Sequence, residues 1–268
     1  MLSIYNWFRY QLPGDKLYKL IRNAGFEATT LWWGNKNHDD YEQHPQLARD
    51  AGLVIEHIHS PYTGANNLWL DNQSGEDEFQ LQLSCVEACA NHEIPTMVMH
   101  LSGGDAPPHY NELGLARIRR LVDLAERIGV NIALENLRKP PYLAYVLENI
   151  FSPRLGFCYD SGHHLLYAKS EDLLAKHGAR IMAMHLHDND GSADQHLLPF
   201  DGMVEWEVIM PALAKTKYAG AISLEVGNSG YTELSPEEFL QVAYERAQKL
   251  EYIMKKMEGN NAGHKTIT

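Results

Sequence analysis

Eight short apolar runs, separated by segments with helical periodicity, constrain the fold of this chain more than any other feature. The runs cover residues 2–7, 26–33, 53–60, 96–101, 130–137, 154–162, 179–187 and 220–227. Strands that are apolar almost throughout are typical of a parallel sheet, because crossover helices cover both of its faces. Eight such units in 268 residues predict a single-domain α/β protein, a (β/α)8 TIM barrel, which needs about 250 residues.

An open, doubly wound sheet is the alternative architecture for the same alternation. It is less favoured, because no glycine-rich phosphate-binding turn follows the first run. Ser235 and Pro236 are a typical start for a last helix, which we expect to end near residue 257. The barrel is therefore expected over residues 1–257, followed by a flexible tail over 258–268.

The charge of the chain bears on its partners. The formal net charge is −12, which disfavours nucleic acid, because cationic side chains dominate affinity for phosphate backbones. The cations expected near the mouth of the barrel are few: Arg9, Lys36, Arg138 and Lys139. A small-molecule substrate is the predicted partner. No apolar stretch is long enough for a membrane span, and no secretory signal is visible, so a cytoplasmic location is expected.

Metal-binding residue types occur where six consecutive predicted strands end. In a barrel these ends converge on one face, so residues far apart in sequence become neighbours. Each residue alone has a plain structural reading as a turn former or a hydrogen-bonded strand end, but buried carboxylates are costly unless paired or metal-bound. Imidazole and carboxylate groups together are the usual ligands of Zn, Mn or Fe. The residues are His59, His100, Glu135, Asp160, His185 and Glu225, with His163, Asp194 and His196 nearby in the chain.

Several motifs resemble the xylose isomerase-like TIM barrel superfamily, which includes sugar phosphate isomerases, epimerases and endonuclease IV. The most specific are LENL at 134–137, DSGH at 160–163, and HLHD at 185–188 followed by Asp194-x-His196. The resemblance runs from the first strand to the eighth. For an isomerase or epimerase it implies one divalent metal, Mn or Zn, held by Glu135, Asp160, His185 and Glu225. For an endonuclease IV-like enzyme it implies three metals, with His59, His100, His163, Asp194 and His196 as additional ligands.

Two chemistries follow from this resemblance. The favoured one is a metal-dependent isomerase or epimerase of a sugar, sugar phosphate or keto acid, working through an enediolate with Glu135 and Glu225 as the acid–base pair. The alternative is a multi-zinc phosphoesterase, either an AP endonuclease or a hydrolase of small phosphoesters. A non-catalytic carbohydrate-binding protein is a third class, and the presence of both glutamates argues against it. The acidic charge and the scarcity of cations favour the first.

Candidate substrate-binding residues surround the predicted site. They are His163, His187, Trp7, Trp33 and Tyr62, with Phe8 and Trp32 in the same group of aromatic residues. Ordinary packing at the barrel mouth explains the aromatic residues equally well. No Arg occurs between Asp188 and Asp194, where some ketose epimerases bind substrate, so no particular sugar is assigned. The apolar last helix is expected to pack on the barrel or to form the face of a homo-oligomer.

Overall fold

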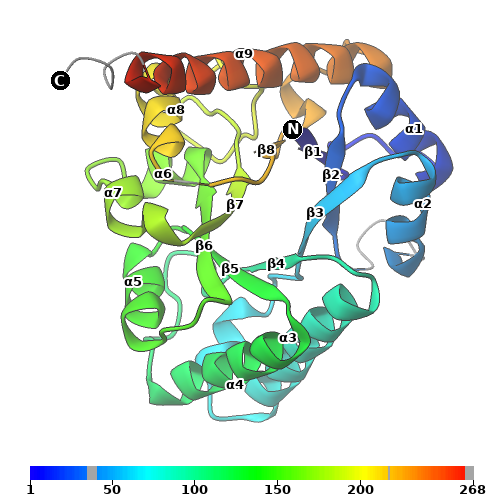
Figure 1. Cartoon of the computed structure of the whole chain (residues 1–268). Coiled ribbons are helices and arrows are strands. Elements are labelled where there is room, and N and C mark those ends of the chain that lie inside the picture. The colour runs from blue at the N-terminus through cyan, green and yellow to red at the C-terminus, as the bar shows by residue number, and fades with distance from the viewer. Residues whose placement is uncertain (35–40, 217, 263–268) are drawn as a thin grey trace.

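Eight parallel strands form a nearly closed barrel with helices around it in a computed structural model of the chain (Figure 1). The structure describes residues 1–34, 41–216 and 218–262. The strands pair in the order β7-β6-β5-β4-β3-β2-β1-β8. A parallel bridge between Leu186 and Leu224 joins the two ends of this sheet. The predicted single-domain (β/α)8 barrel is confirmed.

Every strand lies within one of the apolar runs and is shorter than the run. The strands are β1 (Leu2–Tyr5), β2 (Ala28–Trp32), β3 (Val54–His59), β4 (Thr96–Met99), β5 (Asn131–Glu135), β6 (Leu155–Asp160), β7 (Ile181–His185) and β8 (Ile222–Leu224). Six of the eight strands end at, or directly before, one of the metal-ligand candidates. The loops that follow them therefore carry much of the candidate site.

The helices alternate with the strands and cover the outside of the barrel. They are α1 (Gly14–Ala24), α2 (His44–Asp50), α3 (Gln73–Asn91), α4 (Glu112–Ile128), α5 (Pro140–Asn149), α6 (Ser161–Tyr167), α7 (Leu173–His177), α8 (Trp206–Ala214) and α9 (Pro236–Ala262). Short segments of 3-10 helix are found at η1 (Tyr41–Gln43), η2 (Ala65–Trp69), η3 (Gly178–Arg180) and η4 (Asn228–Gly230). No described helix is both long enough and apolar enough to cross a membrane.

Helix α6 was not predicted, and it begins inside the sixth apolar run, which extends to residue 162. Asp160 ends β6, where a ligand was expected, and it also caps the helix, because its Oδ1 accepts a hydrogen bond from the His163 backbone N–H at 2.7 Å. A side-chain oxygen at this position satisfies one of the unpaired donors of the first helical turn. The cap fixes the carboxylate of Asp160 at the mouth and brings His163 over it.

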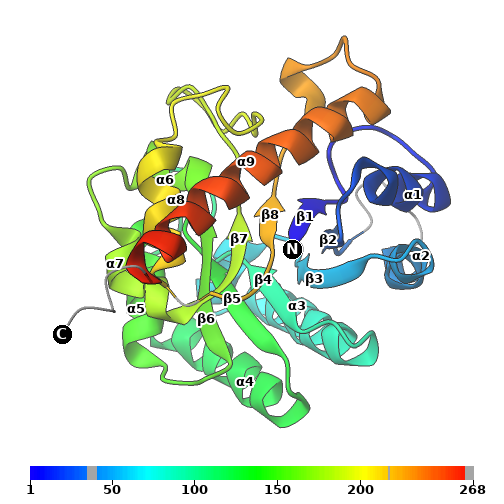
Figure 2. The ribbon, with the colours of Figure 1, turned by 45° about the horizontal axis from the view of Figure 1, so that its top comes forward.

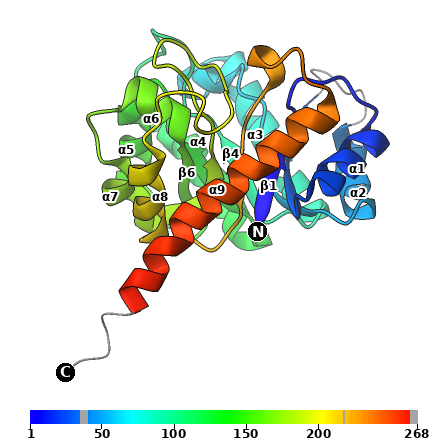
Figure 3. The ribbon, with the colours of Figure 1, turned by 90° about the horizontal axis from the view of Figure 1, so that it is seen from above.

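Helix α9 packs along one side of the barrel, next to α8, α1 and β8 (Figures 1 and 2). Its backbone continues to Ala262, beyond the predicted end near residue 257. Residues 263–268 of the expected tail lie outside the described residues. Figure 3 shows the helix lying across the outside of the barrel. Barrel packing accounts for its main apolar positions, because Phe239, Leu240, Leu250 and Ile253 are all buried.

Candidate metal centre

The strand ends that were predicted to converge do so at the carboxyl-terminal mouth of the barrel. Each of the six strand-end candidates is either the last residue of its strand or the residue directly after it. His59, Glu135, Asp160 and His185 end β3, β5, β6 and β7, while His100 and Glu225 follow β4 and β8. The fold therefore brings six separate chain segments together at one point.

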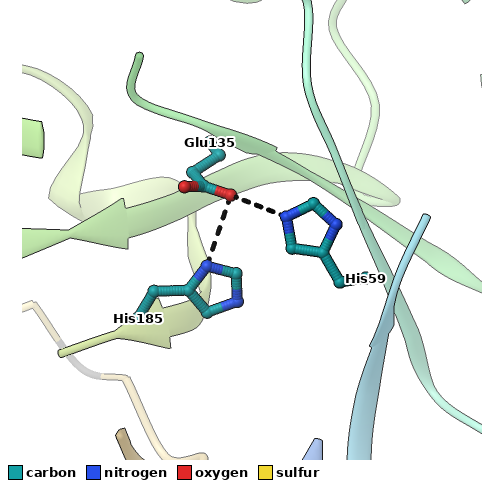
Figure 4. Close-up of side chains that lie close together, drawn as sticks. All are labelled: His59, Glu135 and His185. Atoms are coloured by element: carbon teal, nitrogen blue, oxygen red, sulfur yellow. Dashed lines mark ion pairs between the residues drawn. The ribbon is translucent and has the colours of Figure 1, made fainter. Parts of the chain in front are cut away.

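Glu135 lies at the centre of this group. Its Oε2 atom is 3.1 Å from Nε2 of His100 and 3.3 Å from both Nε2 of His59 and Nδ1 of His185 (Figure 4). Its Oε1 atom is 3.0 Å from Nδ1 of His163. One buried carboxylate thus has four imidazoles within reach, which makes it the anchor of the site.

Three carboxylates and one imidazole form a donor set that fits a divalent metal ion. Glu135, Asp160, His185 and Glu225 each offer one ligand atom, these atoms lie within 4.8 Å of one another, and all four residues are buried. Zn and Mn accept this mixture of nitrogen and oxygen ligands. Three buried carboxylates in such a small volume need a positive charge between them. The donor set therefore matches the four residues that the sequence proposed.

The electrostatics of the site keep its two glutamates ionised. Burial alone would raise the pKa of Glu135, but the imidazoles of His100 and His185 outweigh burial and hold it well below its usual value. Burial likewise opposes ionisation of Glu225, and His185 lowers the pKa of that carboxyl. Both side chains are therefore in the form that can bind a cation or accept a proton.

His57 is a part of the site to which the sequence analysis gave no role. Its Nε2 atom is 3.0 Å from Nε2 of His185. The other ring nitrogen of His185, Nδ1, faces Oε2 of Glu225 at 3.1 Å. A partner on the far nitrogen fixes the tautomer of a ligand histidine and orients its ring. The sequence position of His57 could have indicated this role. His57 and His59 lie two residues apart on β3, and their side chains therefore point to the same face.

Asp194 and His196 also reach the site, although they belong to the long loop after β7. Oδ2 of Asp194 is 3.2 Å from Nε2 of His163 and 3.4 Å from Nε2 of His196. Further possible donor groups are Asp160 with His163 and His187, and His187 with His196 and Glu225. All nine candidate ligands thus gather at one mouth.

His187 was predicted as a substrate-binding residue, but it does not line the pocket. Its ring is fully buried behind Asp160, and its Nε2 atom is 3.1 Å from both oxygens of that carboxylate. Gly162 makes room for it, because a Cβ atom there would lie 2.0 Å from Cε1 of His187. The glycine of the DSGH motif therefore lets His187 orient the Asp160 carboxylate.

Asp188 organises the loop that carries Asp194 and His196. Its buried carboxylate accepts hydrogen bonds from the backbone N–H groups of Phe200 at 3.0 Å and Val204 at 2.9 Å, and from Nε1 of Trp206 at 2.9 Å. A carboxylate with several donors fixes the surrounding backbone. No role was predicted for this residue, although it ends the HLHD motif.

A cavity of about 120 Å³ leads from the mouth to Glu225. Its wall includes Trp7, Trp32 and Tyr62, three of the aromatic residues considered for substrate binding. Trp33 does not line the cavity. Trp33 directly follows β2, and alternation along the strand turns its side chain away from the barrel interior. The centroid of its ring lies 5.0 Å from that of Tyr41.

The other cations and aromatic residues near the mouth have different roles. Phe8 is also not at the cavity, because it is buried and stacks on Phe239 of α9 with ring centroids 6.0 Å apart. Arg138 pairs with Asp105 and donates to the Tyr167 hydroxyl at 3.0 Å. Arg9 lines the cavity. Lys36 lies outside the described residues.

The family of the chain follows from comparison with known proteins. A family model described as xylose isomerase-like TIM barrel matches residues 18–250. This span includes β2 to β8 and all nine candidate ligand positions. The chain belongs to the xylose isomerase-like TIM barrel family. The resemblance of its motifs to this family is thereby confirmed.

Two curated relatives of this family member differ in how much is known of them. An uncharacterized protein of Sinorhizobium fredii, y4fM, is 38% identical, with 94% of each chain covered. An inosose isomerase of Bacillus velezensis is 25% identical over 52% of this chain and 55% of its own length. The first relative carries no known activity, so the name of the second is relevant only to a proposal.

Two solved structures share the whole fold with this chain. A D-tagatose 3-epimerase-like protein superposes with a TM-score of 0.76 at 19% identity, covering 97% of this chain and 98% of the other. The IOLI protein with a bound zinc atom gives a TM-score of 0.75 at 15% identity, covering 96% and 98%. At these identities the likeness establishes the barrel and leaves the chemistry to the residues of this chain.

The protonation of the donor set predicts how metal affinity depends on pH. Burial would lower the pKa of His185, but neighbouring Cys158 and the Glu225 carboxylate outweigh burial and raise it well above its usual value. The metal-free imidazole is therefore protonated near pH 7, and metal binding must displace that proton. We expect zinc binding to release protons and its affinity to rise with pH. Calorimetric titration in two buffers of different ionisation enthalpy measures this release.

The exposed His109 provides a matched control for that titration. We expect His109→Gln to bind zinc with the same proton release as the unmodified protein, whereas His185→Gln loses most of its zinc affinity. Heats that do not depend on the buffer, or an affinity that stays constant as the pH rises, would contradict the assignment.

Proposed function

We propose that this chain is a divalent-metal-dependent isomerase or epimerase that acts on a sugar, a sugar phosphate or a keto acid. The observation that carries the proposal is the pair of buried, ionised glutamates, Glu135 and Glu225, within one metal-type donor set next to an open cavity. The inosose isomerase relative and the epimerase-like structural neighbour support the same class of reaction. A purely binding protein has no need of two bases at this point.

The metal is proposed to be held by Glu135, Asp160, His185 and Glu225. When bound, a divalent ion of this kind supplies Lewis acidity that polarises a substrate carbonyl. Zinc and manganese both suit the donor set, and zinc is the ion named for the IOLI neighbour. One ion is the proposed number, and the second donor group around Asp194 leaves room for more.

The residues of the chain would carry the proton transfer. One of the two glutamates removes the proton from the carbon next to the carbonyl, and the other returns a proton. Return to the same carbon from the opposite face gives an epimer, and return to the adjacent carbon gives an isomer. His163, 3.0 Å from Glu135, is placed to orient that carboxylate or to hold a substrate oxygen. Trp7, Trp32 and Tyr62 offer an apolar wall for the carbon chain.

A multi-zinc phosphoesterase is retained as a second candidate because of one observation. Asp194, His163 and His196 form a further imidazole–carboxylate group beside the first. A hydrolase with several metals would use such groups to hold additional ions. The net charge of −12 disfavours DNA as the substrate, so a small phosphoester is the form of this candidate that agrees with the charge.

Substituting either glutamate tests the acid–base pair. We expect wild-type protein loaded with zinc or manganese to exchange the α-proton of a ketose with deuterated water. Glu135→Gln and Glu225→Gln are expected to slow this exchange by about 10²–10⁴-fold, the usual contribution of a positioned base. Nuclear magnetic resonance of the recovered ketose measures the exchange. Glu87→Gln, on the exposed face of α3, is the matched control and should exchange at the wild-type rate.

Metal content must be measured for the same variants, because loss of the ion would also slow exchange. Exchange at the wild-type rate in a metal-loaded Glu135→Gln protein would refute the role of this residue as the base.

The number of bound ions separates the two candidate functions. We expect elemental analysis to find one equivalent of zinc or manganese per chain. His59→Ala and His196→Ala should retain that equivalent, because neither residue belongs to the four-residue donor set. Three equivalents of zinc, falling on substitution of either histidine, would favour phosphoester hydrolysis instead. Hydrolysis of a small phosphodiester by the same preparation is the companion assay.

A further inference from the structure

Arg9 holds a distinctive place at the candidate site. Among the described residues that line the cavity next to the metal donors, it is the one with a guanidinium or ammonium group. Glu225, one of the metal donors, lines the same cavity. The guanidinium of Arg9 and the candidate metal site therefore share one opening.

The backbone and side chain of Arg9 are both held in an unusual arrangement. Its φ angle is 69°, in the left-handed region that a residue with a Cβ rarely adopts. Its side chain lies against Gly227, where a Cβ atom would come within 2.9 Å of Nε and 3.0 Å of Cδ. Its Nη1 atom donates to the Ser229 hydroxyl. Strain of this kind is concentrated at functional sites, where the surrounding structure maintains it.

Arg9 differs in its partners from Arg138 and Arg246, two arginines of the chain that form ion pairs. Arg138 pairs with Asp105 and Arg246 pairs with Asp201. For Arg9, no carboxylate within the described parts of the chain forms an ion pair, and its hydrogen-bond partner is a neutral hydroxyl. Several N–H donors of the guanidinium are thus left for a ligand.

We propose that Arg9 binds an anionic group of the substrate, a carboxylate or a phosphate, while the metal donors hold the carbonyl end. The planar fork of a guanidinium matches the oxygens of either group with two parallel hydrogen bonds. The inference rests on the proposed function and narrows its substrate class to anionic compounds, which are acidic sugars, keto acids and sugar phosphates. Neutral ketoses would fill the same cavity without this contact.

Binding of matched probes to the metal-loaded protein tests the proposal. The probes are D-fructose, D-fructose 6-phosphate and D-fructuronate, which share a ketose and differ in the terminal group. We expect wild-type protein to bind one of the two charged probes roughly 10-fold to 100-fold more tightly than D-fructose, as for a charge-assisted hydrogen bond. The tighter of the two identifies phosphate or carboxylate as the group. Calorimetric titration gives the dissociation constants.

Two substitutions of Arg9 connect that preference to its guanidinium. We expect Arg9→Gln to bind charged and neutral probes alike, and Arg9→Lys to recover part of the preference. Both variants keep a side chain with a Cβ at the strained φ angle, so backbone strain is the same in all three proteins. Arg127→Gln, on an exposed position of α4, is the control and should keep the wild-type preference. Thermal unfolding of each variant checks that it is folded.

Equal affinity of wild-type protein for charged and neutral probes, including no measurable binding of any, overturns the proposal. A preference that survives in Arg9→Gln overturns it as well. Proton exchange on the same probes reports separately on the proposed function. A charged preference that depends on Arg9, without exchange on any probe, would leave the anion site standing and refute the isomerase assignment. Proton exchange without a preference for the charged probes would support the isomerase assignment and refute the anion site at Arg9.

Discussion

Mutual repulsion of three buried carboxylates is the constraint on which the mouth of this barrel depends. Glu135, Asp160 and Glu225 end or follow separate strands, and their ligand atoms lie within 4.8 Å of one another and of His185. Like charges at this separation in a desolvated site are unfavourable unless a cation or protonated imidazoles lie between them. In the described structure the imidazole of His185 lies 3.3 Å from Glu135 and 3.1 Å from Glu225, and its pKa is raised well above the usual value by Cys158 and Glu225. A divalent ion would replace its proton.

The residues behind the donors explain how the fold holds such a set in place. His57 contacts the far nitrogen of His185, and His187 contacts both oxygens of Asp160. Gly162 leaves the space that His187 needs. Asp188 fixes the loop after β7 through hydrogen bonds from Phe200, Val204 and Trp206. Partners of this kind tune a metal site almost as strongly as its ligands do.

Sequence alone was sufficient where one physical rule decided the outcome. Apolar runs that alternate with helices allow few arrangements, so the barrel and the convergence of Glu135 and His185 were predictable. The orientation of adjacent residues was harder to predict. Alternation along a strand sends Trp32 and Trp33 to opposite faces but does not say which of them points into the barrel. The pairing of β2 with β3 also shifts register between Thr29 and Leu31. The role proposed for Arg9 depends on a left-handed backbone and on contacts with Gly227 and Ser229 after β8, and neither is visible in the sequence.

Anomalous diffraction from crystals of the zinc-loaded or manganese-loaded protein tests the central claim most directly. We expect one dominant anomalous peak within bonding distance of the carboxylates of Glu135, Asp160 and Glu225 and of Nδ1 of His185. The same peak should disappear in Glu135→Gln. A dominant peak that is coordinated by other residues, or the absence of any peak at this mouth in a protein saturated with metal, would contradict the account.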